Sequence, residues 1–559
     1  MKLKYIFPVI FLSAINICFG QKPAIVWQQV YGGNGTDKLC HTITTSDSGL
    51  VLCGYSNSPV SGNKTQKSLN GSYDFWVLKL SKAGLTQWAK TYGGTDRDLH
   101  PTIIQTADSG YLLGGTSISP ASGSKSENAI NQSFDYWVLK LDKAGNVLWN
   151  NTIGGIQFEK LNSLIETKGG YYICGSSNSN DSVDKSAPNV GTSLWPDYWV
   201  VKLNKSGAIL WDSTYGGKNR DELSATTLTA DGGILLAGTS YSQRAALTEK
   251  SQDFLGNGDY WLLKIDSSGK YQWDRTIGGA LSDYLTAIDT VSNIGYVLAG
   301  YSNSPASFNK SDSCRGQTDY WIVRTDKFGN PLWNKTYGGS GADYATTVKF
   351  YNSQIYVGGY SNSGISGDKT SANMGGMDFW TLTLDKYGSI VNQYSWGNSG
   401  DDYMTDFFPS SDTDLVYAGY SNSPVGGDKK YSVVGNTGLF DYWVFKTGNK
   451  KKKNNTQKLE GTAPLIAANA STDNLKSQLS LEIFPNPVKD LLKLNYYNAA
   501  VSNSTTITVY SNNGKLLAKK VLTESSGTFT LDISSEAAGV YYALLQNGAG
   551  SVTKKFIKQ

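Results

Sequence analysis

One acidic residue recurs in every copy of a repeated Gly-Gly segment, four positions after the second glycine or its equivalent. The acids are Asp37, Asp98, Glu159, Asp221, Asp283, Asp343 and Asp402. Carboxylates gathered in one place could hold a cation, bind sugar hydroxyls or provide the pair that cleaves a glycosidic bond. The alternative is structural: each acid accepts hydrogen bonds from backbone N–H groups of its own loop. A residue present in every copy suits that local role, whereas a catalytic residue should be unique.

One lysine also recurs in every copy, nine to twelve residues before a repeated Asp-aromatic-Trp segment. The lysines are Lys64, Lys125, Lys185, Lys250, Lys310, Lys369 and Lys429. We expect each lysine to fold back onto a carboxylate or onto backbone carbonyls and so to tie down its loop. The alternative is a crown of cations for an anionic glycan.

A tyrosine opens a Ser/Asn-rich loop in only four copies. These tyrosines are Tyr55, Tyr301, Tyr360 and Tyr420. Around a closed ring the four copies are neighbours, which predicts a ligand-binding sector where rings, hydroxyls and amides contact a carbohydrate. Packing of the tyrosines between repeats is the alternative.

Other chemistry-bearing motifs are scarce. The two histidines, His41 and His100, are too few for a His-based metal site or for a base repeated in each copy. The sequence lacks zinc-ligand spacing, a phosphate-binding Gly-Lys-Ser/Thr loop, a Gly-x-Ser-x-Gly elbow and an EF-type calcium loop. We therefore predict no metal site and no cofactor, assign no catalytic residue, and leave enzymatic activity open.

Four cysteines follow the N-terminal segment: Cys40, Cys53, Cys174 and Cys314. Cys53 and Cys174 stand where other copies have Gly or Ala, so we expect small buried residues there. A Cys40–Cys53 cross-strand disulfide is compatible with an oxidising compartment, and the sequence does not decide it.

All these residues belong to one long repeat. Its clearest marker is a strand of the type Asp135-Tyr-Trp-Val-Leu-Lys-Leu141, with successive spacings of 61, 62, 62, 60, 59 and 63 residues. The copies begin at Asp74, Asp135, Asp197, Asp259, Asp319, Asp378 and Asp441. A fixed period of this size indicates a repeat architecture.

Each period contains four strand-like pieces separated by Gly turns, which predicts an all-β, seven-bladed β-propeller. An open β-solenoid is the alternative. The repeat is out of phase at its ends, because the strand at Trp27 has no partner before it and the strand at Trp443 has none after it. We expect the N-terminal strand to close the ring and remove the free edge.

By analogy with other propellers, the piece that follows each recurrent acid is placed innermost, and the Trp–Gly-Gly piece outermost. The recurrent acids would then crowd the mouth of the central channel. The long loops and the Gly-Gly segments would share one face of the disc, and the tight turns the other.

Composition and charge limit the classes of partner that the protein can bind and indicate its cellular localisation. A net charge of +4 in 559 residues, with no basic stripe, argues against nucleic acid. Residues 1–20 have two lysines, an apolar run and a small-residue end, as in a signal peptide. No later stretch is long and apolar enough to form a transmembrane segment.

The chain changes character after the repeats. We predict a β-propeller over 21–447, a flexible linker over 448–480 and a small C-terminal β-sandwich, Ig-like in architecture, over 481–559. The last segment carries Phe484-Pro485-Asn486-Pro487, then Gly539-Val540-Tyr541, and ends in a basic run around Lys555.

In these motifs and in their order, the C-terminal segment resembles the type A sorting domain of the Bacteroidota type IX secretion system. The repeats resemble those of secreted Bacteroidota propellers. The resemblance implies export by a Sec signal, periplasmic passage and an engagement of the type IX machinery by the tail. The protein would end outside the cell or on the outer-membrane surface, either released or anchored.

Three functions remain open. The first is a secreted or surface propeller that binds a glycan or a protein without catalysis. The second is a polysaccharide hydrolase or lyase with carboxylates at the channel mouth, which requires two carboxylates in one cleft without equivalents elsewhere. The third is a structural or adhesion component of the cell surface.

Overall fold

The structure is a computed structural model that describes residues 22–191, 194–244, 248–292, 294–410, 414–435, 438–448, 479–484, 488–498, 505–511, 515–522, 526–547 and 550–559. The chain divides into two compact units, residues 1–453 and 454–559. The predicted signal peptide and most of the predicted linker lie outside the described residues.

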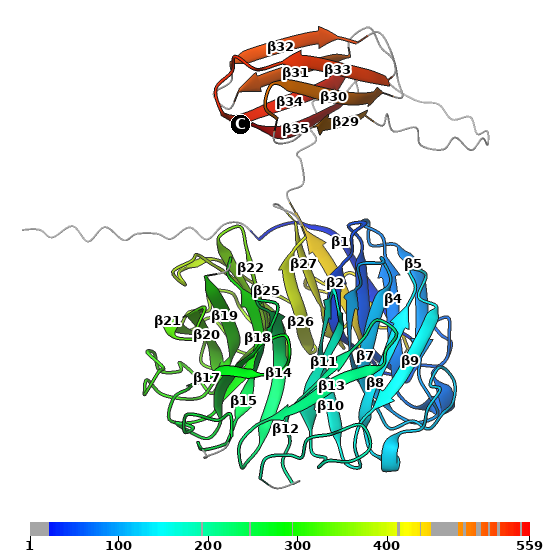
Figure 1. Ribbon diagram of the computed structural model, residues 1–559, viewed down its shortest axis with the longest axis vertical. Helices are drawn as coiled ribbons and strands as arrows, with labels where there is room; N and C mark the ends of the chain where they lie inside the picture. The colour runs from blue at the N-terminus through cyan, green and yellow to red at the C-terminus, as the bar shows by residue number, and fades with distance from the viewer. Residues whose placement is uncertain are drawn as a thin grey trace, which may run out of the picture. The chain divides into compact units, whose positions relative to one another are not determined.

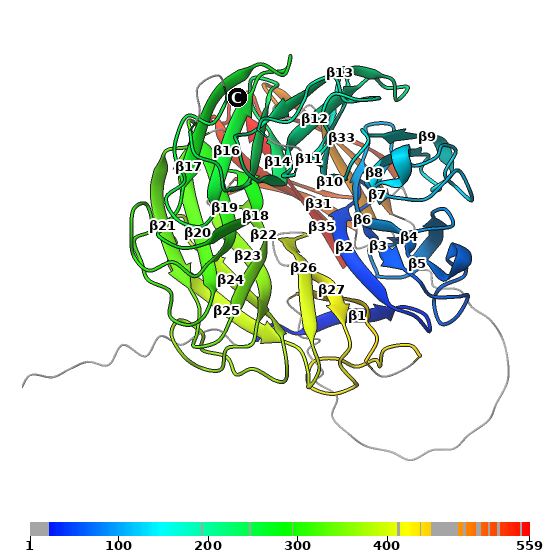
Figure 2. The same ribbon diagram turned by 90° about the horizontal axis from the view of Figure 1, so that it is seen from below.

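Within the described part of the first unit, the strands form seven four-stranded antiparallel sheets around a common axis (Figures 1 and 2). The first strands of the sheets, which line the axis, are β2 (Asp37–Thr44), β6 (Asp98–Gln105), β10 (Glu159–Thr167), β14 (Asp221–Leu228), β18 (Asp283–Thr290), β22 (Asp343–Tyr351) and β26 (Asp402–Pro409). The second strands are β3 (Leu50–Ser56), β7 (Tyr111–Ser117), β11 (Gly170–Ser177), β15 (Ile234–Ser240), β19 (Gly295–Ser302), β23 (Gln354–Ser361) and β27 (Leu415–Ser421).

The two outer positions of each sheet are filled in the same regular way. The third strands are β4 (Asp74–Leu80), β8 (Asp135–Leu141), β12 (Asp197–Leu203), β16 (Asp259–Ile265), β20 (Asp319–Asp326), β24 (Asp378–Leu384) and β28 (Asp441–Thr447). The outermost strands are β5 (Thr86–Tyr92), β9 (Val147–Ile153), β13 (Ile209–Tyr215), β17 (Tyr271–Ile277), β21 (Pro331–Tyr337), β25 (Ile390–Trp396) and, in the last sheet, β1 (Ile25–Tyr31). Two short 3₁₀ helices, η1 (Leu69–Gly71) and η2 (Ile130–Gln132), lie in long loops.

The last sheet takes its outermost strand from the start of the chain. Its order is β1-β28-β27-β26, with Val30 opposite Trp443 and Tyr31 opposite Tyr442. The pairing is antiparallel, as the out-of-phase ends of the repeat predict. It covers an edge of β28 that would otherwise expose a row of N–H and C=O groups.

Aromatic residues of the third strands fasten neighbouring sheets together. The ring of Tyr260 lies 4.7 Å from that of Trp321 in the next sheet, and the Tyr260 hydroxyl donates a 3.0 Å hydrogen bond to the Trp321 carbonyl. The same contact joins the last sheet to the first, where Tyr442 donates to the carbonyl of Trp76 over 3.1 Å. Each Asp-aromatic-Trp strand is therefore buried on both faces, which explains why its sequence does not alternate.

Each inner strand carries an irregularity after its second or third residue. In β10, for example, Leu161 and Ser163 have partners in β11 but Asn162 is passed over. Such a bulge inserts one extra residue and re-aims its side chain. As a result, a side chain near the middle of each inner strand is free to face the axis.

The C-terminal unit consists, in its described part, of two sheets that enclose one hydrophobic core. The sheet orders are β29-β30-β33 and β32-β31-β34-β35. Leu492, Ile507 and Phe556 are among the fully buried residues of this core. The strands are β29 (Leu479–Phe484), β30 (Leu491–Asn498), β31 (Thr506–Ser511), β32 (Leu516–Val521), β33 (Ser526–Asp532), β34 (Gly539–Asn547) and β35 (Gly550–Lys558).

Candidate functional site

A cavity of about 1080 Å³ lies on the axis of the first unit and is lined by described residues of all the inner strands. A polar band surrounds its middle. Five of the seven bulged residues at this level are polar, namely Asn162, Ser224, Thr286, Thr346 and Thr405, and Cys40 and Pro101 occupy the other two places. Some hydroxyls of the band also join neighbouring sheets, since Thr286 donates to the Ala345 carbonyl over 2.9 Å.

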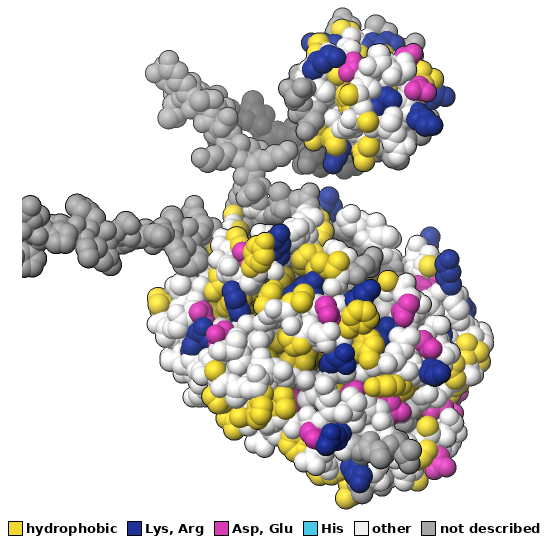
Figure 3. Space-filling model, turned by 60° about the vertical axis from the view of Figure 1, so that its left-hand side comes forward, with side chains coloured by type: hydrophobic (Ala, Val, Ile, Leu, Met, Phe, Trp, Pro, Cys, Tyr) yellow, Lys and Arg dark blue, Asp and Glu magenta, His cyan; other side chains and the backbone are white. Residues whose placement is uncertain are grey.

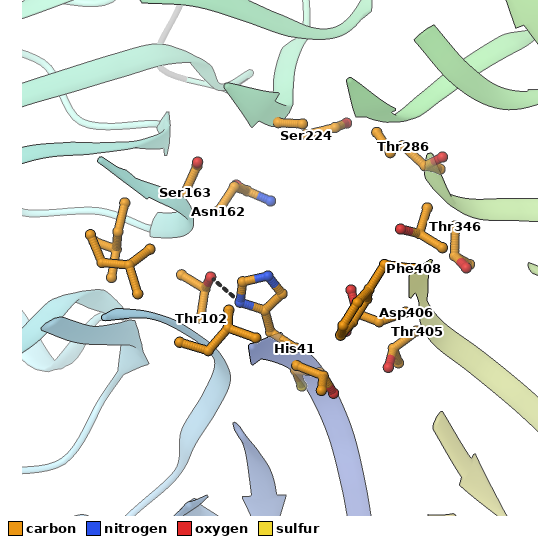
Figure 4. Close-up of a pocket in the computed structure, with 18 of the residues that line it drawn as sticks. His41, Thr102, Asn162, Ser163, Ser224, Thr286, Thr346, Thr405, Asp406 and Phe408 are labelled. Atoms are coloured by element: carbon orange, nitrogen blue, oxygen red, sulfur yellow. Dashed lines mark hydrogen bonds between the residues drawn. The ribbon is translucent and has the colours of Figure 1, made fainter. Parts of the chain in front are cut away.

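One sector of the cavity carries titratable groups (Figure 4). The Nδ1 atom of His41 lies 3.1 Å from the Thr102 hydroxyl. Asp406 is 8% exposed, and its Oδ2 atom has no hydrogen-bond partner in the described part of the chain. Burial lowers the pKa of His41 and raises that of Asp406, and the charges of His41 and Lys349 partly offset the rise. Asp406 is the only carboxylate among the described residues that line the cavity.

The recurrent acids do not lie at the channel mouth, which corrects our expectation. Each one is the first residue of an inner strand, as predicted, but all of them are fully buried and none lines the cavity. Asp37 shows the reason: its Oδ2 accepts hydrogen bonds from the Gly33 N–H and the Ser58 hydroxyl, both at 2.8 Å. The contacts of these acids are those of the structural alternative, and no solvent-exposed surface remains on Asp37, Asp98, Glu159, Asp221, Asp283, Asp343 or Asp402.

Each recurrent acid instead faces a second buried carboxyl, the aspartate that opens the third strand of the preceding sheet. The pairs are Asp441–Asp37, Asp74–Asp98, Asp135–Glu159, Asp197–Asp221, Asp259–Asp283, Asp319–Asp343 and Asp378–Asp402. Burial, together with the neighbouring carboxyl, raises the pKa of Asp74 to about 8 and that of Asp197 to about 9. Two ionised carboxyls only accept hydrogen bonds, so a proton between them is the natural way to satisfy both.

The recurrent lysines are buried between these pairs, and we call the whole arrangement the acid–lysine belt. Lys64 interacts with the charges of Asp37 and Asp74 and donates a hydrogen bond to the Thr91 hydroxyl over 2.8 Å. Lys369 donates to the backbone carbonyls of Ser363 and Ser371. The prediction that the lysines tie down their loops is confirmed, and a surface crown of cations is excluded by their burial.

The first glycine of each Gly-Gly pair gives the carboxyls room. A Cβ on Gly154 would lie 2.2 Å from Asp135 Oδ1 and 2.9 Å from Glu159 Oε2. No side chain fits there, so the repeated Gly-Gly is explained by close approach to the belt.

Three of the four predicted tyrosines, Tyr301, Tyr360 and Tyr420, belong to a larger aromatic arc on the rim of the channel, whereas Tyr55 contacts Tyr73 and His100. Tyr301 stacks on Tyr284 of the same sheet at 5.0 Å and contacts Tyr344 of the next sheet edge-on at 5.0 Å. Tyr344, Tyr360, Tyr403, Tyr420 and Phe440 continue the arc through ring contacts of 5.0–5.8 Å. The rings are half-buried, so they pack between sheets and still reach solvent. Tyr55 and Tyr420 also line the cavity.

The rim next to the aromatic arc is basic. Lys38, His100 and Lys160 all line the cavity. His100 is in edge contact with Tyr55 at 5.5 Å, and Lys38 lies over the Tyr420 ring, where the basic residues meet the arc. We call these three residues the basic rim.

The four cysteines are unpaired. Cys40 is the bulged residue of β2 and lines the cavity, whereas Cys53 lies in the hydrophobic core between sheets. Cys53 pairs with His41 and not with Cys40, and the two thiols are not joined by a disulfide in this structure. Cys53 and Cys174 are fully buried, as predicted.

Several channel residues escaped the sequence-based search. His41 and Asp406 occupy equivalent places two residues after the Leu or Met of the inner strand, where other copies have Ala, Ser or Thr. Lys38 and Lys160 directly follow a recurrent acid. An alignment of the inner strands with one another marks these four residues as outliers. Our predictions rested instead on the residues that the copies share.

The second unit contains the signal that sorts the protein for secretion. Residues 482–559 match the family model of the secretion system C-terminal sorting domain. The chain carries a type IX sorting tail. This tail is typical of Bacteroidota and directs a protein to the outer-membrane surface or the medium.

The described residues of the sorting tail include part of its predicted motif. Gly539 opens β34, and Tyr541 is buried, stacks on Phe556 at 5.6 Å and donates to the Ala537 carbonyl over 2.7 Å. Lys555 is exposed on β35. Phe484 ends β29, and Pro485, Asn486 and Pro487 lie outside the described residues.

The first unit is similar to proteins of diverse function. The regulatory protein FlaEY of Caulobacter vibrioides is 22% identical over an alignment of 425 residues that covers 68% of this chain and 44% of that protein. The chain therefore spans less than half of that relative. Among solved structures, the Pan2 WD40 domain of Neurospora crassa is 10% identical, with a TM-score of 0.40 over 74% of this chain and 90% of that one.

A Bacteroides vulgatus protein of the DUF4221 family is 7% identical, with a TM-score of 0.31 over 77% of this chain and 99% of that one. Similarity at these levels says nothing about a ligand.

On the face drawn in Figure 3, acidic and basic side chains are interspersed, in keeping with the small net charge. Among the described residues, no helix is long and apolar enough to cross a membrane.

Proposed function

We propose that the protein is a secreted or surface-displayed propeller that binds a glycan or a protein at the rim of its central channel. The observation that carries this proposal is the half-buried aromatic arc beside a polar cavity of about 1080 Å³. Ligand sites combine a concave surface, aromatic contact area and a few well-placed polar groups.

We also infer that the sheets form a closed seven-bladed propeller over residues 21–447. The pairing of β1 with β28 and the contact between Tyr442 and Trp76 support this closure. The linker, 448–480, and the tail, 481–559, complete the inferred organisation. Export would begin with Sec-dependent removal of residues 1–20 and continue through the periplasm to the type IX machinery, which the tail engages.

The test is an array of glycans and extracellular proteins probed with the full secreted chain. We expect saturable binding that is lost in Tyr420→Ala and kept in Tyr431→Ala, which removes a tyrosine 49% exposed in the long loop of the same sheet. Thermal unfolding of both variants separates loss of binding from loss of fold. Failure of every glycan and protein to bind would favour the structural role instead.

The hydrolase alternative requires two carboxylates in one cleft. Asp406 is the only carboxylate among the described cavity residues, so the cavity does not contain such a pair there. The appearance of new reducing ends on the array would nevertheless revive this alternative.

A further inference from the structure

The basic rim presents positive charge that no acidic neighbour neutralises. Lys38 and Lys160 take part in no ion pair within the described part of the chain. The Lys38 ammonium lies 5.1 Å from the Phe440 ring and 5.5 Å from the Tyr420 ring, so it sits over the aromatic arc. Asp406, the only carboxylate among the described cavity residues, interacts instead with His41 and Lys349.

His100 is held in an unusual backbone conformation at this rim. Its φ is 51°, within the left-handed region that non-glycine residues seldom adopt. The strain coincides with the irregularity of β6 between Leu99 and Thr102, which brings the imidazole to the cavity wall. Strained residues of this kind cluster at binding sites.

We propose that the basic rim and the aromatic arc together bind an acidic glycan, a polysaccharide whose sugars carry carboxylate or sulfate groups. This inference rests on the proposed function and names its ligand class. Pyranose C–H faces would lie against the tyrosine rings, while the anionic groups contact Lys38 and Lys160. Sugar hydroxyls would exchange hydrogen bonds with the threonine and serine hydroxyls of the polar band.

The unneutralised charges are what favour an anionic ligand over a neutral one. Lysines around a partly enclosed, low-dielectric mouth raise the local concentration of anions. The polar band favours a sugar over an acidic peptide, because sugar hydroxyls can donate to the oxygens of Thr286, Thr346 and Thr405, whose own protons are bonded to backbone carbonyls. The interaction should weaken as salt screens the charges.

The binding test uses oligogalacturonate and a sulfated dextran as acidic probes, a neutral malto-oligosaccharide as the comparison, and poly-glutamate as the acidic peptide. Calorimetry with the full chain should show binding of at least one acidic glycan, with an affinity that falls as salt rises. Lys38→Gln and Lys160→Gln should each weaken it about tenfold, in line with the loss of one charge-assisted contact of about 1.4 kcal/mol. Lys82→Gln, at an exposed lysine in the turn after β4, is the matched control and should bind normally.

The pKa of His100 provides a second measurement of binding. It would not change if Lys38 and Lys160 only stabilised the fold. Part of its ring reaches solvent, but partial desolvation and the positive charges of Lys160 and Lys38 lower its pKa to about 4. Tyr55 is its aromatic neighbour. An anion bound between the lysines would stabilise the imidazolium, so an acidic probe should move this pKa towards its ordinary value of about 6.5 in an NMR titration. His100→Gln identifies the signal, since the only other histidine is His41.

The outcomes separate this inference from the proposed function. Equal binding of neutral and acidic glycans, with an unchanged His100 pKa, overturns the inference and leaves the proposed function standing. Tighter binding of poly-glutamate than of any glycan overturns the glycan class. Binding of no probe, here and on the broader array, overturns both. Acidic-glycan binding that is sensitive to Lys38→Gln and raises the His100 pKa supports both.

Discussion

At the scale of single residues, the acid–lysine belt explains the most repeated feature of the sequence. The glycine, the acid and the lysine of each copy lie together in one buried region, which explains why all three recur in every copy. A glycine next to two carboxyls is required because no side chain fits there. A glycine in a turn without such neighbours is not required for packing.

Gly154→Ala should therefore destabilise the first unit. Its Cβ would overlap Asp135 and Glu159, and relief requires movement of buried groups. Overpacking of this kind costs about 1–3 kcal/mol. Urea unfolding should show a lower midpoint for Gly154→Ala, while Gly169→Ala, where no atom lies within 4 Å of the new Cβ, should unfold nearly as the parent does. Equal midpoints for the two variants would contradict the packing explanation.

Replacement of a belt lysine should be more damaging than its position in a loop suggests. Lys64→Met removes the positive charge between Asp37 and Asp74 and the hydrogen bond that Lys64 donates to the Thr91 hydroxyl. Loss of one partner of a buried charge group costs about 3–5 kcal/mol. Thermal unfolding should show a large drop for Lys64→Met and little change for Lys67→Met, which alters an exposed lysine of the same loop. A small effect at Lys64 would mean that the carboxyls do not need this charge.

At the scale of elements, the strand β1 is buried on both faces near its end, where Val30 and Tyr31 belong to different cores, and is exposed near its start. Val30 is 7% exposed and packs with Trp443, whereas Val26 is 51% exposed. Val30→Asp places a charge in that core and should lower the melting temperature strongly, and Val26→Asp should change stability by less than about 0.5 kcal/mol. If Val30→Asp melts like the parent, β1 does not contribute to the stability of the last sheet.

The sequence predicted these elements well because their signals are repeated. The Asp-aromatic-Trp strand, the hairpin turns and the unmatched Trp27 segment each predicted an element and its place in the order β1-β28-β27-β26. The predicted position of the recurrent acids was wrong, because they are buried and do not line the cavity. A carboxyl at the start of an inner strand can face the axis or the neighbouring sheet, and only the path of the Gly-Gly loop decides which.

The site was predicted less well than the fold. Tyr301 and Tyr360 were identified because they differ between copies, yet Tyr284, Tyr344 and Tyr403 were missed since they do not open a loop. The role of the basic rim depends on the bulges, which rotate side chains towards the cavity. A bulge has no distinct composition here, so the sequence does not reveal it.

At the scale of the whole molecule, the belt should make stability depend on pH. A carboxyl whose pKa is higher in the folded than in the unfolded protein stabilises the fold below its unfolded pKa, about 3.9. That contribution is lost as pH rises through the folded values, which run from about 6 for Asp259 to about 9 for Asp197. Each unit of pKa difference corresponds to about 1.4 kcal/mol.

We therefore expect the melting temperature of the first unit to fall between pH 5 and pH 8. Above pH 8 the buried lysines act in the opposite direction, since burial lowers the pKa of Lys125 to about 8 and loss of its proton relieves the cost. Calorimetry across this range is the measurement. Asp197→Asn mimics a permanently protonated carboxyl, so it should flatten the profile. Asp181→Asn, at an exposed aspartate in the same loop, should leave the slope unchanged. Parallel profiles for the parent and Asp197→Asn would contradict a shared proton in this pair.

The borrowed strand of the last sheet has a bearing on how the polypeptide leaves the cell. Residue 25 cannot reach its partner at residue 447 until the ribosome has made almost everything in between. A growing chain therefore keeps one sheet edge unsatisfied throughout synthesis, and contacts this distant in sequence form slowly. In the Sec-dependent route proposed above, this delay would keep the precursor unfolded until it has crossed the inner membrane, so that the sheets would assemble in the periplasm.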